Sequence, residues 1–236
     1  MVSQLLLGEV FEVREKKQPW LRIHTHCDDY DGWVDEKQVQ EIEQTLFLEL
    51  TSSPNCCALE PFTFAESNIR KLTVFKGSSL PNYENQSFKI NDELFQFSAP
   101  ISEGLSQDLS EQIPAFAMSF LNMPYLWGGR SPAGIDCSGF TNIVYKLAGI
   151  KLRRDAWQQS EQGILISFID EARPGDLAFF QNEEGRIIHV GIILQQQKII
   201  HASGRVRIDT IDHYGIYDEE LKKYTHQLRL IRRMIG

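Results

Sequence analysis

The sequence changes its pattern of apolar residues near residue 105, and this change limits the folds that the chain can adopt. The run LSEQIPAFAMSFLNMP has the apolar spacing of a helix that is interrupted or begun at Pro114. After a Gly- and Pro-rich loop, apolar residues at i, i+3, i+4 and i+7 from Phe140 predict a helix that ends at Gly149. Four strand-like runs follow: GDLAFF, IIHVGIIL, KIIHASG and LRLIRRM. Helices followed by antiparallel strands predict an α+β domain over residues 105–236.

The first 104 residues contain short β-rich runs separated by polar or turn-rich breaks. EVFEV, WLRIHTH and YDGWV have the spacing of strands in a small barrel and predict a first β domain over residues 1–44. TLFLEL, IRKLTVF, SFKI and ELFQFS predict the strands of a second, divergent β domain over residues 45–104. We interpret TSSPNCCALEPF as a loop and GSSLPNYENQ as a turn-rich connector.

The composition excludes several kinds of partner. A formal net charge of -8 over 236 residues argues against nucleic-acid binding and against docking on an anionic membrane. No run approaches the roughly 18 apolar residues of a membrane span. The start, MVSQLLLGEVFEVREKK, lacks the basic residues and apolar core of a secretory signal, although a leader removed from the natural protein would leave the same sequence. Because a chain of this size needs no disulfides, we expect reduced thiols and a cytoplasmic location.

Cys137 lies in PAGIDCSGF, directly before the apolar residues from Phe140 that predict the second helix. Asp136 can cap that helix, which would make Cys137 its first residue. Unpaired N–H groups and the helix dipole stabilise an anion there, so we expect the pKa of this thiol to lie below its free value. Ser138 and Gly139 are small and would let a substrate approach. Cys137 is therefore a candidate nucleophile, and the alternative is a buried packing residue.

Two histidines provide a candidate base and its partner. The strands HVGIIL and KIIHASG are joined by QQQ, which is typical of a hairpin. If Leu194 faces Lys198, Gly191 lies opposite His201, and His189 becomes a diagonal neighbour of His201 on the same face. Gly191 would leave room between the two imidazoles. A slip of one residue would place the histidines on opposite faces, so this prediction depends on the register.

The remaining cysteines and histidines have no assigned role. They are Cys27, Cys56, Cys57, His24, His26, His213 and His226. The stretch HTHCDD over residues 24–29 mimics a metal cluster. A strand alternates its faces, so its two histidines would point one way and its cysteine the other. We therefore expect no metal there.

In this order DCSGF, HVGIIL and IIHASG resemble the NlpC-type cell-wall cysteine peptidases, which have a papain-like α+β fold. PYLWGGRSPAGIDCSGF, RRDAWQQ and RPGDLAFF fit the same pattern, and the resemblance covers residues 105–236. The barrel-like first half is similar to the bacterial SH3-type domains attached to γ-D-glutamyl-L-diamino-acid endopeptidases of this family. That part rests mainly on YDGWV and GSSLPNY.

The resemblance implies a nucleophile at Cys137, a base at His189 and an orienting residue at His201. It also implies substrate contacts by Tyr30, Tyr125, Trp127, Asp136, Ser138 and Asp155. Asp155 matches an acidic position that holds the substrate's free amine, and Tyr30 is the candidate for an aromatic hydroxyl from the first β domain. Ala156 stands where some relatives carry serine, which puts one substrate hydrogen bond in doubt. The structural alternatives are loop packing for Tyr125 and Trp127, helix capping for Asp136, a surface ion pair for Asp155 and a core strand for Tyr30.

The implied reaction is hydrolysis of the γ-D-glutamyl-L-diamino-acid bond in murein stem peptides with a free N-terminal L-Ala, without a metal or cofactor. The alternatives are an amidase or acyltransferase on the same scaffold, a hydrolase acting on intact murein, or a wall-binding protein with an inactive papain-like domain. The presence of Cys137, His189 and His201 together favours the enzyme. The sequence leaves the diamino acid open between lysine and diaminopimelate, and it leaves the oligomeric state open.

Overall fold

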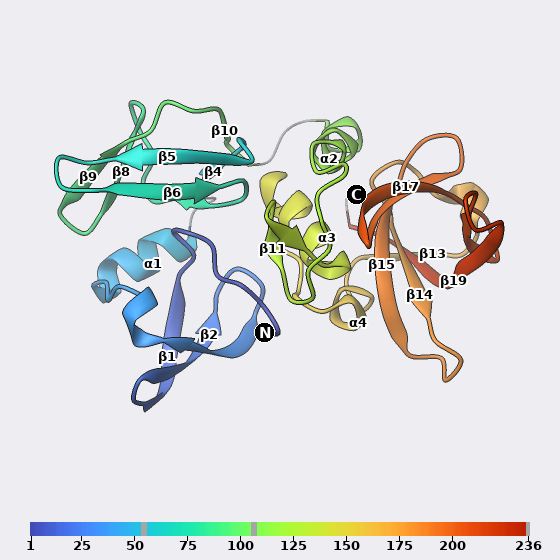
Figure 1. Ribbon diagram of the computed structural model, residues 1–236, viewed down its shortest axis with the longest axis horizontal. Helices are drawn as coiled ribbons and strands as arrows, with labels where there is room; N and C mark the ends of the chain where they lie inside the picture. The colour runs from blue at the N-terminus through green and yellow to red at the C-terminus, as the bar shows by residue number, and fades with distance from the viewer. Residues whose placement is uncertain (53–55, 105–107, 235–236) are drawn as a thin grey trace.

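The computed structural model describes residues 1–52, 56–104 and 108–234, which form two small β units and a larger α+β unit (Figure 1). The first unit is an antiparallel sheet with the order β1-β2-β3, made of Phe11–Lys17, Trp20–Thr25 and Tyr30–Asp35. A short 3-10 helix over Glu36–Gln38 follows. The three predicted β-rich runs overlap these strands, so their prediction as strands is confirmed.

The run TLFLEL is a helix, and its prediction as a strand is wrong. It lies within α1 (Gln44–Ser52), of which Leu50 is the buried residue. Alternation of leucine with Phe47 and Glu49 mimics a strand, which would place Leu48 and Leu50 on one face. Leu48 is instead 58% exposed. Leucine, glutamate and glutamine are favourable helix formers, and this preference prevails in a segment with little burial.

The second β unit contains two small sheets. One has the order β6-β5-β9-β8, with strands Lys71–Phe75, Phe62–Glu66, Glu93–Gln96 and Ser87–Ile90. The other has the order β10-β4-β7, with strands Ile101–Ser102, Cys56–Ala58 and Ser79–Leu80. Phe88 stacks on Phe95 with ring centroids 5.4 Å apart, and both lie in the core of this unit.

Two of these strands lie where the sequence predicts a loop and a connector. Cys56–Ala58 lies in TSSPNCCALEPF, of which residues 53–55 are outside the described residues. Ser79–Leu80 lies in GSSLPNYENQ. Strands of two or three residues are too short to show a period, and their pairing partners are distant in the sequence. The predicted limits of the β domains, 1–44 and 45–104, stay predictions, and residue 105 lies outside the described residues.

The α+β unit begins with helices, as predicted. They are α2 (Leu109–Met118), α3 (Cys137–Leu147) and the short α4 (Ala156–Gln159). Between α2 and α3 lies a two-stranded ribbon, β11 (Arg130–Ser131) and β12 (Gly134–Ile135). The predicted apolar stripe of α3 is completely buried, and α3 ends before Gly149, whose φ of 76° favours glycine.

The strands of this unit close into a barrel. Their order is β13-β19-β14-β15-β16-β17-β18, and β18 also pairs with β19. The strands are Ile164–Ile166, Lys223–Arg233, Leu177–Gln181, Ile187–Ile193, Lys198–Ser203, Arg205–Ile211 and Gly215–Asp218. A second 3-10 helix spans Ile169–Glu171. The four predicted strands correspond to β14, β15, β16 and β19, whereas β13, β17 and β18 were not predicted.

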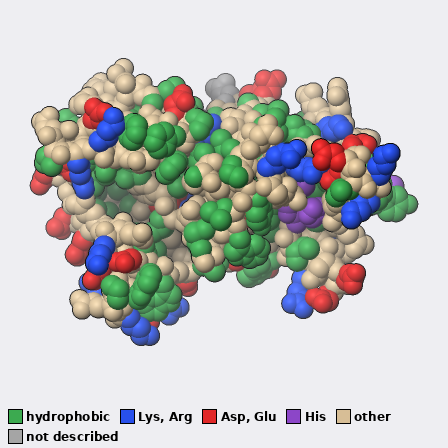
Figure 2. Space-filling model, in the orientation of Figure 1, with side chains coloured by type: hydrophobic (Ala, Val, Ile, Leu, Met, Phe, Trp, Pro, Cys, Tyr) green, Lys and Arg blue, Asp and Glu red, His purple; other side chains and the backbone are tan. Residues whose placement is uncertain are grey.

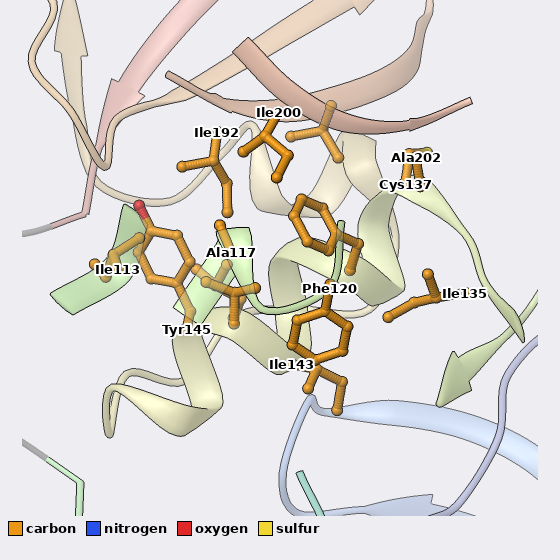
Figure 3. Close-up of a cluster of buried hydrophobic side chains, with 14 of the residues drawn as sticks. Ile113, Ala117, Phe120, Ile135, Cys137, Ile143, Tyr145, Ile192, Ile200 and Ala202 are labelled. Atoms are coloured by element: carbon orange, nitrogen blue, oxygen red, sulfur yellow. The ribbon is translucent and has the colours of Figure 1, made fainter. Parts of the chain in front are cut away.

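Two hydrophobic clusters place the helices against the barrel. The larger joins α2 and α3 to one face of β15 and β16, and Figure 3 shows Cys137 among its side chains with Ile192, Ile200 and Ala202. The other cluster contains Phe180, Ile193 and further residues of the barrel strands. Residues of β15 and β16 therefore alternate between a face against α3 and a face inside the barrel.

A buried ion cluster ties the chain's N-terminal segment to the α+β unit. The completely buried Glu9 carboxylate contacts Arg130 at 2.8 Å and Lys146 at 2.8 Å. Burial would raise the pKa of Glu9, but Arg130 and then Lys146 outweigh it and hold this pKa well below its usual value. Asn142 on α3 accepts a 2.8 Å hydrogen bond from Arg130. The later turns of α3 and the N-terminal segment are thus connected by charged hydrogen bonds.

The surface agrees with the charge composition. Figure 2 shows basic and acidic side chains interspersed on the face in view, without a broad basic patch there. Over residues 1–52, 56–104 and 108–234, no helix is long and apolar enough to cross a membrane.

Candidate active site

Cys137 is the first residue of α3, as predicted from the sequence. Asp136 caps the helix, and its Oδ1 accepts a 2.7 Å hydrogen bond from the N–H of Gly139. A Cβ at Gly139 would lie 2.3 Å from the carbonyl oxygen of Gly129, so only glycine lets the preceding loop pack on this turn. The loop and the cap together fix the backbone around the thiol.

The Cys137 thiol does not have the low pKa that its helix position predicts. Burial, followed by the Asp136 carboxylate, raises the pKa of Cys137 to about 12. The backbone amides of Val190 and Ser138, and then Arg154, act in the opposite direction. The helix start does stabilise a thiolate, but the cost of removing that anion from water is larger. In the resting chain Cys137 is therefore a protonated thiol.

His189 and His201 form the predicted diagonal pair. Gly191 pairs with His201 in the β15–β16 ladder, which is the predicted register. His189 Nε2 lies 2.8 Å from His201 Nδ1, and both rings are buried. A Cβ at Gly191 would lie 2.9 Å from the His201 Cβ, so glycine leaves the space that the pair needs. The hairpin prediction is confirmed.

His189, one member of this histidine pair, is uncharged at neutral pH. Burial, then His201 and His226, lowers the pKa of His189 well below its usual value. His189 precedes Val190, whose backbone amide interacts with the Cys137 thiol. β15 therefore places His189 near the N-terminal end of α3, where Cys137 lies. The site holds a neutral thiol and a neutral imidazole, which is a competent acid–base pair once a substrate is attacked.

Two residues of the site were missed by the sequence analysis. Asp209 on β17 accepts from His201 Nε2 at 2.9 Å. His226 on β19 stacks on His189 with ring centroids 4.2 Å apart, and burial lowers the pKa of His226 to about 4. In the β16–β17 ladder, Ile199 pairs with Asp209, which makes Asp209 a diagonal neighbour of His201. The hairpin rule that located His189 would therefore have located Asp209.

Asp136 and Ser138 lie in one buried network with Arg154. Arg154 donates to Asp136 Oδ2 at 2.7 Å and to the Ser138 hydroxyl at 2.9 Å. Asp136 Oδ2 also accepts from the N–H of Gly128 at 2.8 Å. Asp136 is thus more than a helix cap, because it also fixes the loop before Cys137. Two predicted substrate residues are placed next to the nucleophile by this network.

Tyr30 and Asp155 are brought together from two different units. Burial raises the pKa of the Tyr30 hydroxyl, and the charge of Asp155 and a hydrogen bond to it raise that pKa further. Beside them Arg153 contacts Asp29 at 2.8 Å, which joins the first β unit to the segment before α4. Arg154 pairs with Asp136. The two arginines that precede Asp155 thus form ion pairs with other carboxylates. Tyr30 is the first residue of β3, is partly buried, and interacts across the boundary between the two units.

The two aromatic residues of the approach loop have different surroundings. Tyr125 packs against the core cluster that contains Cys137. Burial, followed by the charges of Cys137 and Asp136, raises the pKa of Tyr125 to about 12. Its backbone N–H donates to the carbonyl of Gly204 at 3.1 Å, next to the end of β16. Trp127 is 71% exposed, so it is a surface residue rather than loop packing.

His24 of the HTHCDD stretch contacts two nearby carboxylates. His24 lies 2.9 Å from Asp29 and 3.3 Å from Asp31. Within the described part of the chain, no group of three or more His, Cys, Asp or Glu side chains could hold a metal ion.

Comparison with known proteins gives family matches for the first β unit and for the α+β unit. Residues 122–228 match the NlpC/P60 family, and residues 1–39 match the bacterial dipeptidyl-peptidase Sh3 domain. Dipeptidyl-peptidase 6 of Lysinibacillus sphaericus is 36% identical over 255 residues, which cover 94% of this chain and 88% of that protein.

Two Bacillus proteins with the name γ-D-glutamyl-L-lysine dipeptidyl-peptidase are also similar. The Bacillus subtilis protein is 29% identical, with 93% of this chain and 78% of that protein covered. The Bacillus cereus protein is 27% identical, with 85% of this chain covered, and the matched region spans about two thirds of that protein, 66%.

A solved structure supports the fold over almost the whole chain. The crystal structure of an NlpC/P60 family protein from Bacillus cereus superposes with a TM-score of 0.82 at 24% identity, and covers 99% of this chain and 82% of that one. The papain-like unit with SH3-like β units before it, predicted from the sequence, is therefore confirmed. With its thiol, its histidine pair and these relatives, the chain belongs to the NlpC/P60 family of cysteine peptidases.

Proposed function

We propose that the chain hydrolyses the bond between D-glutamate and the L-diamino acid in murein peptides that begin with a free L-alanine. The names of the Bacillus relatives support a γ-D-glutamyl bond as the target. The observation that carries the proposal is the thiol of Cys137 at the start of α3, in contact with the amide that follows His189. His189 is in turn bonded to His201 at 2.8 Å.

The reaction begins from a neutral pair. The Cys137 Sγ attacks the γ-carbonyl carbon of D-glutamate while its proton passes to His189. The tetrahedral intermediate then expels the amine of the diamino acid, which takes that proton and leaves a thioester on Cys137. Water attacks the thioester and gives a proton to His189. The carbon–sulfur bond then breaks, His189 returns that proton to the Cys137 sulfur, and the released dipeptide carries the new carboxyl group, which ionises. His201 orients His189 throughout.

The oxyanion needs donors that are already in place. The Cys137 N–H lies in the first turn of α3, where backbone N–H groups have no partner within the helix. The Tyr125 hydroxyl belongs to a ring beside Cys137 and remains protonated, because its pKa is raised to about 12. We assign these two donors to the developing charge, which preorganised hydrogen bonds stabilise strongly.

Tyr30 and Asp155 are the proposed site for the substrate's free amine. An ammonium group that enters between the hydroxyl and the carboxylate gains charge-assisted hydrogen bonds. An acetylated or glycan-linked amine has no charge to pair with the carboxylate. It also needs space that the first β unit occupies, and both effects disfavour its binding. Asp136, Ser138 and Trp127 are the further proposed substrate contacts.

We further propose L-lysine as the diamino acid and the cytoplasm as the place of action. The relatives' names support lysine. A site that requires a free amine suits small released peptides better than intact murein, which supports a role in peptide recycling. Comparing the lysine and diaminopimelate tripeptides tests the first proposal, and fractionation of cells with detection of the protein tests the second.

The decisive experiment measures kcat/KM by mass spectrometry for L-Ala-γ-D-Glu-L-Lys and for its N-acetylated form. We expect acetylation to cost about 2–4 kcal/mol in kcat/KM, the scale of one buried charge pair. Asp155→Asn should remove most of this discrimination, and Cys137→Ser should lower hydrolysis by several orders of magnitude while the chain still folds. Asp29→Asn, which removes the neighbouring carboxylate that contacts Arg153 and His24 but leaves Asp155 in place, is the matched control.

Each alternative has its own result. Equal rates on intact murein, the acetylated peptide and the free tripeptide would identify a general wall hydrolase. Binding to murein without cleavage of any of these substrates would identify an inactive wall-binding protein. Activity of Cys137→Ser above about a tenth of the original would refute the nucleophile, since removal of a triad member is far more costly.

A further inference from the structure

The histidine pair continues to a buried carboxylate on the neighbouring strand. Asp209 lies on β17 and is 6% exposed. Its Oδ2 lies 2.9 Å from His201 Nε2, and the other ring nitrogen of His201, Nδ1, lies 2.8 Å from His189 Nε2. Three side chains from β15, β16 and β17 therefore form one chain of hydrogen bonds that ends at His189, the residue before Val190, whose backbone interacts with the Cys137 thiol.

Asp209 stays ionised in this position. Burial would raise its pKa, but the hydrogen bonds from His201 and Arg207 outweigh burial and lower the pKa of Asp209. Arg207 donates to Asp209 Oδ1 at 2.8 Å. Arg207 also lies 3.1 Å from Asp218 Oδ2, so a second carboxylate on β18 holds the guanidinium in place.

An ionised carboxylate accepts hydrogen bonds and cannot donate them, and this fixes the proton positions along the chain. His201 must carry its proton on Nε2 to donate to Asp209. With one proton on each ring, His201 Nδ1 is then an acceptor, and His189 must donate from Nε2. The unprotonated nitrogen of His189 is consequently Nδ1, the one nitrogen free to take the thiol proton.

We infer that Asp209 is a positioning residue, which holds both histidines in the tautomers that leave His189 Nδ1 unprotonated for Cys137. The inference rests on the proposed roles of Cys137 and His189 in hydrolysis. It adds a residue that touches neither the substrate nor the thiol. Its effect passes through two rings and depends on the direction of two hydrogen bonds.

Asp209→Asn tests this direction. An asparagine amide can donate to His201 Nε2, which moves the His201 proton to Nδ1 and the His189 proton to its own Nδ1. His189 then has no lone pair for the thiol. We expect kcat to fall about a thousandfold, less than the roughly ten-thousandfold loss on replacing the carboxylate of a catalytic triad, because Asp209 acts through a second ring; KM should change less than about threefold. Asp209→Glu keeps an acceptor and should recover part of the lost kcat.

The tautomers are observed directly by ¹⁵N NMR of the histidine rings at mildly alkaline pH, without a substrate. We expect Nε2–H tautomers for His189 and His201 in the original chain and an Nδ1–H tautomer for His189 in Asp209→Asn. Asp176→Asn is the matched control, because Asp176 is a buried carboxylate paired with Arg233 at 2.8 Å in the same unit. It should keep both tautomers and the kcat of the original.

The inference fails if His189 in the original chain carries its proton on Nδ1, a result that needs no variant to fold. It also fails if Asp209→Asn retains its kcat, or if Asp176→Asn lowers kcat equally at similar stability. Because tautomers are read without substrate, Nε2–H signals together with no hydrolysis of any murein peptide would refute the proposed function and leave the tautomer assignment standing.

Discussion

Cys137 combines a helix start, which favours a thiolate, with burial, which opposes it. Because burial and Asp136 raise its pKa to about 12, the thiolate fraction at neutral pH is small and grows as the pH rises. We therefore expect iodoacetamide to label Cys137 more slowly than free cysteine, with a rate that still increases between about pH 8 and pH 10. Peptide mapping by mass spectrometry follows this residue separately from the other thiols. Fast labelling with a plateau near neutral pH would mean a resting thiolate.

At the residue scale, the sequence predicts contacts between site residues on strands joined by a short hairpin. It does not predict contacts between residues on strands joined by a long connection. The register that pairs Gly191 with His201 follows from three loop residues. Asp209 obeys the same rule one hairpin later, and it was missed because residues 205–211 were not predicted to form a strand. His226 reaches His189 through the β14–β19 pairing, which joins segments with no short loop between them. No local pattern shows that contact.

The β15–β16 hairpin depends on the absence of a side chain at Gly191. A Cβ there would lie 2.8 Å from the Ile199 side chain and 2.9 Å from the His201 Cβ, and a Cβ cannot move without its strand. We expect Gly191→Ala to cost about 1–3 kcal/mol of stability by overpacking and to lower kcat by displacing His201. Thermal unfolding and kinetics on the tripeptide measure both effects.

Gly32→Ala is the control for this element. Gly32 also lies in a strand, β3, but a Cβ there has nothing within 4 Å. It should change neither the unfolding temperature nor kcat. If Gly191→Ala behaved in the same way, the close fit of the hairpin around the imidazole pair would be wrong.

Among the elements, long apolar stripes were predictable and short or weakly buried segments were not. The apolar stripe of α3 from Phe140 and the strands of HVGIIL and KIIHASG are almost wholly buried. Their sequence pattern therefore reflects the burial of apolar side chains more than any other effect. In TLFLEL the burial of Leu50 alone gives no period, and helix propensity decides. β4 and β7 exist because distant segments pair with them.

At the scale of the whole molecule, recognition of the free amine needs two units in a fixed relation. Tyr30 comes from the first β unit and Asp155 from the α+β unit, and their interaction exists only while the units stay together. The resemblance named both residues, but composition and periodicity cannot show the contact that holds them. Glu9 and Arg130 are 121 positions apart, and their completely buried ion pair has no local signal in the sequence.

Removing the Glu9 charge should therefore impair specificity as well as stability. Glu9→Gln leaves Lys146 without its buried counter-charge and leaves Arg130 with the more distant carboxylate of Asp28, 3.9 Å away; breaking a buried pair of this kind typically costs about 3–5 kcal/mol. As the first β unit loosens, we expect kcat/KM for the free tripeptide to fall toward that of its N-acetylated form, because Tyr30 no longer meets Asp155. The rate at which iodoacetamide labels Cys137 should not fall, since α3 and the barrel keep their own core.

Glu12→Gln is the matched control, because Glu12 pairs with Arg14 at 2.7 Å on the exposed surface of the same unit. An exposed pair of this kind contributes about 0–1 kcal/mol, so this variant should keep the stability and the selectivity of the original. The decisive quantity is the ratio of kcat/KM for the free and acetylated peptides, measured below the unfolding temperature of each variant. If Glu9→Gln is destabilised yet keeps that ratio, the first β unit does not contribute to amine recognition, and Asp155 must provide it without Tyr30.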